Sequence, residues 1–158
     1  MTGATTIFVH AHPDDESLFT GGRQAMGFAR GERQVLVTCT DGSLGFDPEG
    51  QTPLDDDHDR TATALARSAE LRLAVGLLGC DRLIELAYPD SGMAGWPTCE
   101  SPAAFANQPV DDVAGRLVAI FDDEGPCVVV TYAADGFYGH PDHVATHRAV
   151  NSRRPAPC

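Results

Sequence analysis

Short runs rich in apolar residues recur along the chain, each about the length of one buried strand. Four such runs stand out, at residues 7–10, 35–39, 82–86 and 128–131. The first joins β-branched and aromatic residues and ends in a cluster of histidine and carboxylate side chains, as expected where a buried strand enters a loop. The pattern therefore predicts four strands.

Helices are predicted between these strands. Residues 17–30 have helical composition and are followed by Gly31, and residues 60–78 are rich in Ala, Leu and Arg and are followed by Gly79. Glycine just after the last turn is a common helix end. A third helix is predicted over 110–121. Within the second helix, apolar residues recur in near-helical steps at Leu65, Ala69, Leu73 and Leu77.

Two long loops complete the pattern. Residues 41–57 contain five glycines and prolines, and residues 88–109 lack a regular apolar period. Strands that alternate with helices indicate an α/β, Rossmann-like fold, with a mainly parallel β-sheet flanked by helices. Functional groups in such folds lie on loops at the carboxyl ends of the strands. We expect residues 1–158 to form one domain.

The charge balance narrows the classes of partner. The chain has 11 basic and 23 acidic residues, a net charge of −12. This charge disfavours nucleic acid and anionic membranes as partners. All the basic residues are arginines, so a Schiff-base lysine and a phosphate-loop lysine are excluded. Because the N-terminal sequence has no basic segment and no long apolar run, we expect a cytoplasmic enzyme.

The five cysteines are odd in number, widely spaced and free of any C-x-x-C pair, which predicts reduced thiols rather than a disulfide framework. They are Cys39, Cys80, Cys99, Cys127 and Cys158.

The loop after the first strand carries the most informative chemistry. In this position many α/β folds bind phosphate through glycines and backbone N–H groups. Here the residues are His-Pro-Asp-Asp-Glu, 12–16, whose carboxylates would repel a phosphate and attract a divalent cation. A second cluster, Tyr-Gly-His-Pro-Asp-His at 138–143, follows the fourth strand. The two strand ends are expected to converge on one metal site.

Two histidines and one carboxylate with an open coordination position suit catalytic zinc. The same ligand set also serves Fe(II) in facial-triad enzymes, so Zn²⁺ is favoured and Fe²⁺ remains an alternative.

The sequence resembles the LmbE-like deacetylases, which include the PIG-L enzyme of GPI-anchor synthesis and the mycothiol-pathway deacetylases. The resemblance runs in order through AHPDDES at 11–17, VTCTDG at 37–42, RSAEL at 67–71, PDSGMAG at 89–95 and GHPDH at 139–143. The segments RSAEL and PDSGMAG are most similar to the mycothiol branch. The resemblance implies a zinc-dependent enzyme that removes an N-acetyl group from a small amino-sugar substrate.

The resemblance also implies roles for individual residues. His12, Asp15 and His143 would bind the metal, and Asp14 would be the general base. His140 would stabilise the oxyanion or act as an acid, and Asp142 would orient His140. For substrate binding, the resemblance implies that Asp90 holds a sugar hydroxyl, Arg67 reaches the distal part of the substrate, and Tyr138 forms a mobile wall.

The chain departs from the family pattern in two ways. Ser43 stands where a glutamate is common, and the chain ends soon after the second histidine motif. The resemblance thus implies that the usual C-terminal portion is missing, which could impair substrate binding more than metal binding. Three alternatives follow: a mycothiol S-conjugate amidase, a non-catalytic remnant that binds metal and sugar, and a metal phosphoesterase. A phosphoesterase would normally require a second metal or several cationic groups to bind the phosphoryl oxygens, and Arg67 is the only evident candidate.

Other polar residues have simpler interpretations. We expect His10 to lie in packing or to bond the backbone, and His58 to be exposed. His147, four residues after His143, faces either the metal or, as we favour, solvent. The acidic run 55–57 lacks the spacing of a calcium loop and is expected to be a solvated loop. Asp90 alone could simply form an Asx turn.

Overall fold

The fold is an α/β sandwich built on four parallel strands. A computed structural model describes residues 5–152. The strands are β1 (Thr5–His10), β2 (Gln34–Thr40), β3 (Arg82–Tyr88) and β4 (Cys127–Val130), in the spatial order β3-β2-β1-β4. All three pairings are parallel. The predicted parallel sheet flanked by helices is confirmed, and the predicted strands differ by a few residues at their ends.

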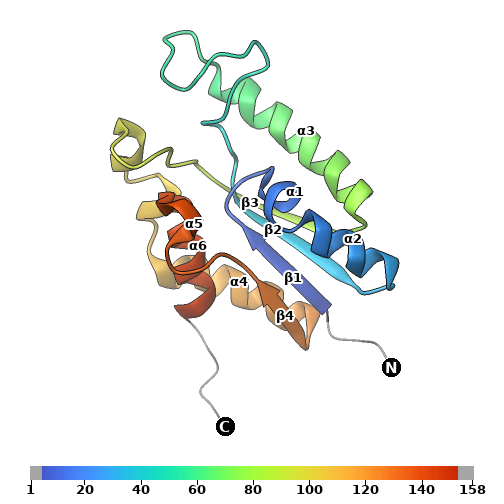
Figure 1. The fold of residues 1–158 in the computed structure, drawn as a ribbon. Coiled ribbons are helices and arrows are strands. Elements are labelled where there is room, and N and C mark those ends of the chain that lie inside the picture. Colours follow the sequence, from blue (N-terminus) through green and yellow to red (C-terminus); the bar gives the residue numbers. More distant parts are fainter. Residues whose placement is uncertain (1–4, 153–158) are drawn as a thin grey trace.

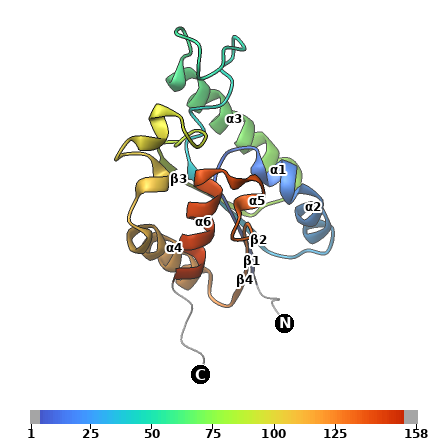
Figure 2. The same cartoon turned by 60° about the vertical axis from the view of Figure 1, so that its left-hand side comes forward.

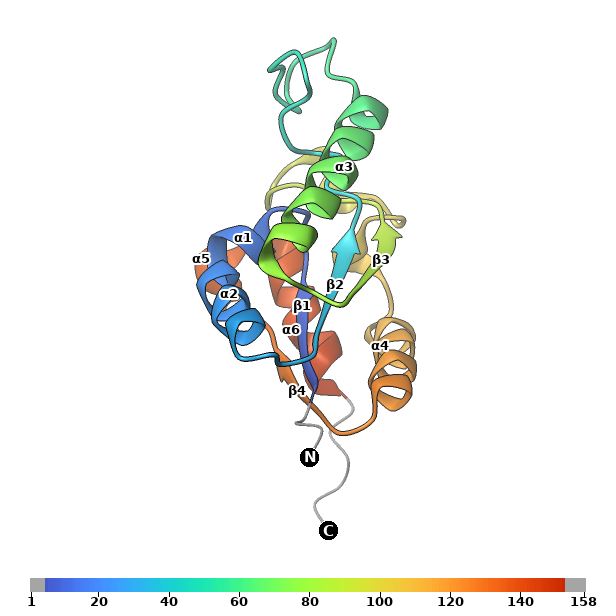
Figure 3. The same ribbon diagram turned by 90° about the vertical axis from the view of Figure 1, so that its right-hand side faces the viewer.

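Alternating side chains of the strands build two cores. Phe8 and Leu36 face one side, where they pack against Leu71 of α3 (Arg60–Leu78). Ile7 and Val9 face the other side, where the core includes residues of α4 (Val110–Glu124) and α6 (Pro141–Ser152). Successive strand residues point to opposite faces, so both sides of a central strand become buried. Figure 1 and Figure 3 show α3 and α4 on opposite sides of the sheet.

The first predicted helix is broken into two. Residues 15–30 form α1 (Asp15–Phe19) and α2 (Gly21–Ala29), interrupted at Thr20. The Thr20 hydroxyl bonds His10 Nε2 at 2.8 Å, and two glycines follow it. A side-chain contact to the sheet and a glycine pair together explain the kink, which the sequence pattern did not reveal.

The other helices match their predictions closely. α3 has the predicted bounds, and α4 extends three residues beyond them. The apolar stripe of α3 is nevertheless on its outer face: Leu65, Leu73 and Leu77 are exposed, whereas Leu71 and Thr63 are buried. The helix packs on the sheet through the opposite side, so the stripe predicted the helix without marking its buried face.

Both long loops lie at the carboxyl end of the sheet. Residues 41–59 lie beyond the start of α3, at the top of Figure 1. The second loop contains two short 3₁₀ turns, η1 (Pro97–Glu100) and η2 (Phe105–Asn107), and a four-residue turn, α5 (Gly136–Gly139), precedes α6. α4 and α6 lie side by side (Figure 2). Within residues 5–152, no helix combines the length and hydrophobicity needed to cross a bilayer.

Four of the cysteines are unpaired, as predicted: Cys39, Cys80, Cys99 and Cys127. Cys158 lies outside the described residues.

Candidate metal centre

Parallel strands bring the two histidine motifs together. β1 and β4 are neighbours in the sheet, so the loops that follow their carboxyl ends meet at one edge. His12 comes from the loop after β1, Asp15 is the first residue of α1, and His143 comes from the first turn of α6. All three side chains are buried.

Three ligand atoms form a compact triangle. His12 Nδ1 lies 3.3 Å from Asp15 Oδ2, His143 Nε2 lies 3.4 Å from the same oxygen, and the two nitrogens are 3.3 Å apart. Around a zinc ion with bonds of about 2.0–2.1 Å, the corners of a tetrahedron lie about 3.3–3.4 Å apart. The triangle therefore has the dimensions of one face of a tetrahedral zinc site, which leaves the fourth position open.

Hydrogen bonds orient both histidines for such a role. His12 Nε2 lies 3.2 Å from Asp142 Oδ2, and His143 Nδ1 lies 3.2 Å from the carbonyl oxygen of Gly136. In each ring, a proton on the outer nitrogen leaves the lone pair of the inner nitrogen directed into the triangle. Carboxylate and carbonyl partners of this kind are usual for histidines that bind metals.

The electrostatics of the cluster favour a cation. Burial alone would lower the pKa of His12, but hydrogen bonds to Asp142 and Asp15 raise it to about 10. Although burial opposes ionisation of Asp15, its bonds to His12 and His143 hold its pKa well below the usual range. The negative charge that retains a proton on His12 would also retain a divalent ion.

Asp14 has a different environment from its neighbour Asp15. Its side chain is 50% exposed and forms an ion pair with Arg67 at 2.6 Å. Its backbone adopts φ 136°, a strained conformation for a residue with a side chain, and its N–H donates to Glu16 Oε2 at 2.9 Å. Burial raises the pKa of Asp14, and the charge of Arg67 opposes this effect. A carboxylate beside the metal triangle but outside it suits a general base.

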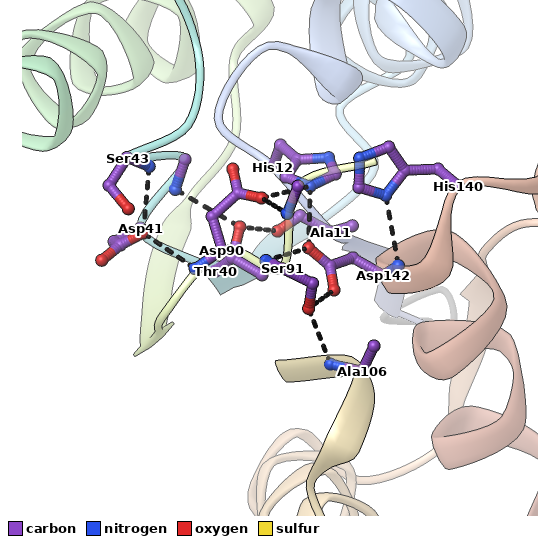
Figure 4. Close-up of polar contacts among 12 residues, drawn as sticks. Ala11, His12, Thr40, Asp41, Ser43, Asp90, Ser91, Ala106, His140 and Asp142 are labelled. Carbon is purple, nitrogen blue, oxygen red and sulfur yellow. Dashed lines mark hydrogen bonds and ion pairs between the residues drawn. The ribbon is translucent and has the colours of Figure 1, made fainter. Parts of the chain in front are cut away.

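Asp142 contacts a different histidine from the one we expected. Its carboxylate bonds His12 and also accepts hydrogen bonds from the backbone N–H and the hydroxyl of Ser91. Only its backbone N–H bonds His140, at Nδ1 and 3.2 Å (Figure 4). The N–H of Asp142 bonds His140 because it lies in the first turn of α6, where N–H groups have no acceptor within the helix.

His140 is buried beside His12, with ring centroids 4.5 Å apart. Burial, together with the nearby His12, lowers its pKa to about 4, so the ring is neutral at neutral pH. Because Nδ1 accepts a hydrogen bond, the single proton of this ring resides on Nε2. His140 can also be grouped with His12 and His143, with ligand atoms within 4.8 Å of one another. The triangle that includes Asp15 is tighter and fits tetrahedral zinc better.

A pocket of about 200 Å³ opens next to the triangle. Asp90, Arg67 and Tyr138 all line it, as the family resemblance implies. Asp90 forms the expected Asx turn with Gly92, and its carboxylate lies 3.8 Å from His12 Nε2. The guanidinium of Arg67 contacts Asp14 and the carbonyl oxygen of Pro13. Apolar side chains complete the wall: Leu18, Phe19, Leu44, Met93 and Trp96.

The remaining histidines lie outside the triangle. His10 is buried and bonds the side chain of Thr20. His58 is half-buried, which corrects our expectation of full exposure, because its Nε2 bonds the carbonyl oxygen of Gly45 at 2.8 Å. His147 is half-buried and lies outside the triangle; its Nδ1 bonds the carbonyl oxygen of Tyr132, so the fully solvated position that we favoured is not observed. The acidic run 55–57 is exposed, as predicted.

Two residues of the site were missed from the sequence. Tyr132 donates its hydroxyl hydrogen to Asp15 Oδ2, and Ser91 holds Asp142. A signal existed for Tyr132, since it directly follows the predicted strand 128–131, whose carboxyl end lies at the same sheet edge. Burial raises the pKa of Tyr132, so its hydroxyl remains a donor.

Comparison with known proteins identifies the family. The family model described as PIG-L, GlcNAc-PI de-N-acetylase, matches residues 7–153. The chain belongs to this family. A deacetylase of Mycobacterium sp. (strain KMS), named for 1D-myo-inositol 2-acetamido-2-deoxy-alpha-D-glucopyranoside, is 46% identical over 153 residues, which cover 92% of the chain and 48% of the relative. The chain thus spans about half the length of the curated relatives it matches.

Solved structures show the same fold. An N,N'-diacetylchitobiose deacetylase from Pyrococcus horikoshii matches with a TM-score of 0.71 and 23% identity, covering 92% of this chain and 47% of that one. The 4-carboxy-2-hydroxymuconate hydratase GalB from Pseudomonas putida KT2440 matches with a TM-score of 0.72 and 18% identity, covering 95% and 55%. Since the fold also serves a hydratase, the function must be argued from the site.

Proposed function

We propose that this chain is a zinc-dependent hydrolase that removes the acetyl group from a small, cytoplasmic N-acetylglucosamine-containing molecule. The triangle of His12, Asp15 and His143 beside Asp14 is the observation that carries the proposal. Its edges match a tetrahedral site with one open position, and amide hydrolysis needs both an electrophilic centre and a nearby base.

Zinc held by these three residues would polarise the acetyl carbonyl and make water more acidic. The residues of the chain supply the proton transfers. Asp14 takes a proton from the attacking water as the C–O bond forms. His140, neutral with its proton on Nε2, stabilises the developing oxyanion by donating a hydrogen bond to it and keeps its proton. The C–N bond then breaks, the amine leaves with the proton that Asp14 received, and acetate is the second product.

The pocket supports a small polar substrate. Its volume is below the ~300–1,000 Å³ typical of sites for drug-sized ligands, so it suits one sugar-sized ring with its acetyl group. The Asp90 carboxylate can accept a hydrogen bond from a sugar hydroxyl, and Tyr138, 58% exposed, borders the opening. Arg67 forms an ion pair with Asp14, and we propose that it also contacts the distal part of the substrate.

The proposal is tested by measuring acetate release. The substrate is 1D-myo-inositol 2-acetamido-2-deoxy-alpha-D-glucopyranoside, for which the relatives are named. We expect acetate release in the presence of Zn²⁺, and parallel assays with Fe²⁺ test the alternative metal. Acetate release that persists after complete metal removal would contradict the proposal.

Two related outcomes have distinct signatures. Cleavage of a mycothiol S-conjugate, with no acetate released from the deacetylase substrate, would indicate the amidase variant. Zinc binding without turnover of either compound would indicate a protein that binds metal and sugar only. Each result would replace the proposed deacetylation.

A further inference from the structure

Tyr132 lies between the two segments that supply the metal triangle. It follows β4 and is only 3% exposed. Its hydroxyl accepts a hydrogen bond from the Ala11 N–H at 2.7 Å and donates to Asp15 Oδ2 at 2.5 Å. A single buried hydroxyl therefore bridges the backbone just before His12 and the carboxylate of the triangle.

The ring of Tyr132 contacts the other segment. It stacks on the imidazole of His143, with centroids 4.1 Å apart and planes inclined by 6°. The ring of Phe19 also lies against Tyr132, with centroids 6.3 Å apart. This parallel contact restricts rotation of the His143 imidazole about its Cβ–Cγ bond. The hydrogen bond between Nδ1 and the carbonyl oxygen of Gly136 restricts the same rotation.

The backbone at Tyr132 is itself held in place. Val130 is in register with Phe8 of β1, and the Thr131 hydroxyl donates to the carbonyl oxygen of Val9 at 3.0 Å. The carbonyl oxygen of Tyr132 bonds His147 Nδ1, one turn beyond His143 on α6. Tyr132 is thus fixed relative to both the β1 loop and α6.

We propose that Tyr132 is a positioning residue that keeps Asp15 and His143 at the separation one divalent ion requires. This inference rests on the proposed metal centre. Without the hydroxyl, Asp15 loses a donor that restrains its rotation, and the Ala11 N–H loses its acceptor. Hydrogen-bonded neighbours of metal ligands commonly raise metal affinity about 10–100-fold.

The test is zinc affinity, measured without substrate. Tyr132→Phe keeps the ring on His143 and removes only the hydroxyl. Competition with a chromophoric chelator should show zinc binding weakened about 10–100-fold. The visible spectrum of the Co²⁺-loaded variant should also change, because the geometry at Asp15 changes. Tyr88→Phe is the matched control, since the Tyr88 ring packs on Phe105 away from the triangle, and it should bind zinc like the wild type.

The outcomes separate this inference from the proposed function. A wild-type chain that binds no zinc would overturn the metal centre itself. Wild-type zinc affinity in Tyr132→Phe, with or without a loss of folding stability in the metal-free protein, would overturn only the role of Tyr132. A second measurement does not depend on the folding of Tyr132→Phe. The variant Tyr138→Phe removes the tyrosine on the pocket wall and keeps Tyr132 at the triangle. Addition of zinc to this variant should perturb the tyrosine absorption. No perturbation would contradict the inference.

Discussion

At the scale of single residues, the neighbouring carboxylates of Asp14 and Asp15 lie in different surroundings. Asp15 is buried, accepts hydrogen bonds from His12 N–H and Tyr132, and belongs to the metal triangle. Asp14 is half-exposed and paired with Arg67. The positive φ of Asp14 turns the backbone between them, so that the two side chains diverge. The strain is located at the residue proposed to handle the proton.

Two substitutions should therefore have different effects. Asp15→Ala removes a ligand, so zinc content and acetate release should fall together. Asp14→Asn preserves the shape of the side chain, so zinc should remain bound while kcat falls about 10²–10⁴-fold, the usual contribution of a positioned base. Zinc content and steady-state kinetics measure both effects. Full activity in Asp14→Asn would exclude it as the base, and loss of zinc from that variant alone would reverse the two assignments.

At the scale of elements, α3 shows how local signals set both ends of a helix. The Asp59 carboxylate accepts hydrogen bonds from the N–H groups of Thr61 and Ala62, both at 2.9 Å. At the other end Gly79 adopts a left-handed conformation, and its N–H bonds the carbonyl oxygen of Val75. The helix positions Arg67 against the loop that carries Asp14. Its ends thus contribute to the geometry of the site.

Two glycines near the end of α3 should respond in opposite directions to alanine. In Gly79→Ala, the new Cβ would lie 2.2 Å from atoms of Phe28 and φ is +72°, so the free energy of unfolding should fall by more than about 1 kcal/mol. Gly76 lies within α3, and apart from its chain neighbours and the backbone of its own helix no atom would lie within 4 Å of a new Cβ there. In Gly76→Ala the free energy of unfolding should therefore rise by about 0.5–1 kcal/mol. Urea unfolding measures both. Equal changes in the two variants would show that the capping conformation is unimportant.

At the scale of the whole molecule, a metal would connect segments far apart in sequence. His12 and His143 are 131 residues apart along the chain, and their ring nitrogens are 3.3 Å apart. A ligand that binds only the folded state adds to its stability in proportion to the logarithm of its concentration. Metal binding should thus stabilise the sheet edge where β1 and β4 end.

Removal of the metal should lower stability measurably. At a free Zn²⁺ concentration 100 times Kd, the free energy of unfolding should exceed that of the chelator-treated protein by about 2.7 kcal/mol. His143→Ala should lose this increase. His58→Ala is the control, because His58 bonds a loop carbonyl away from the triangle and should retain the increase. An equal response to zinc in both variants would place the bound metal elsewhere.

Most helices and strands, and the chemical character of the site, were predictable from local patterns in the amino-acid sequence. α3 has its predicted bounds because its cap residues lie next to it in the chain. The strands were predictable because buried strands are short and apolar. The two histidine motifs, at 12–16 and 138–143, could be expected to meet once a parallel sheet was predicted, since parallel strands bring their carboxyl ends to one edge. The choice of His12, Asp15 and His143 as ligands within these motifs came from the family resemblance.

The contacts between side chains of the site could not be predicted from the sequence pattern, because they join residues that are far apart along the chain. The break at Thr20 depends on His10, and the target of the Asp142 carboxylate depends on the first turn of α6. Tyr132 bonds Asp15 across 117 positions of sequence. Such contacts depend on strand order, register and side-chain direction, which no local pattern encodes. The exposed leucine stripe of α3 has the same cause, because a helical period predicts a helix but not the face that packs on the sheet.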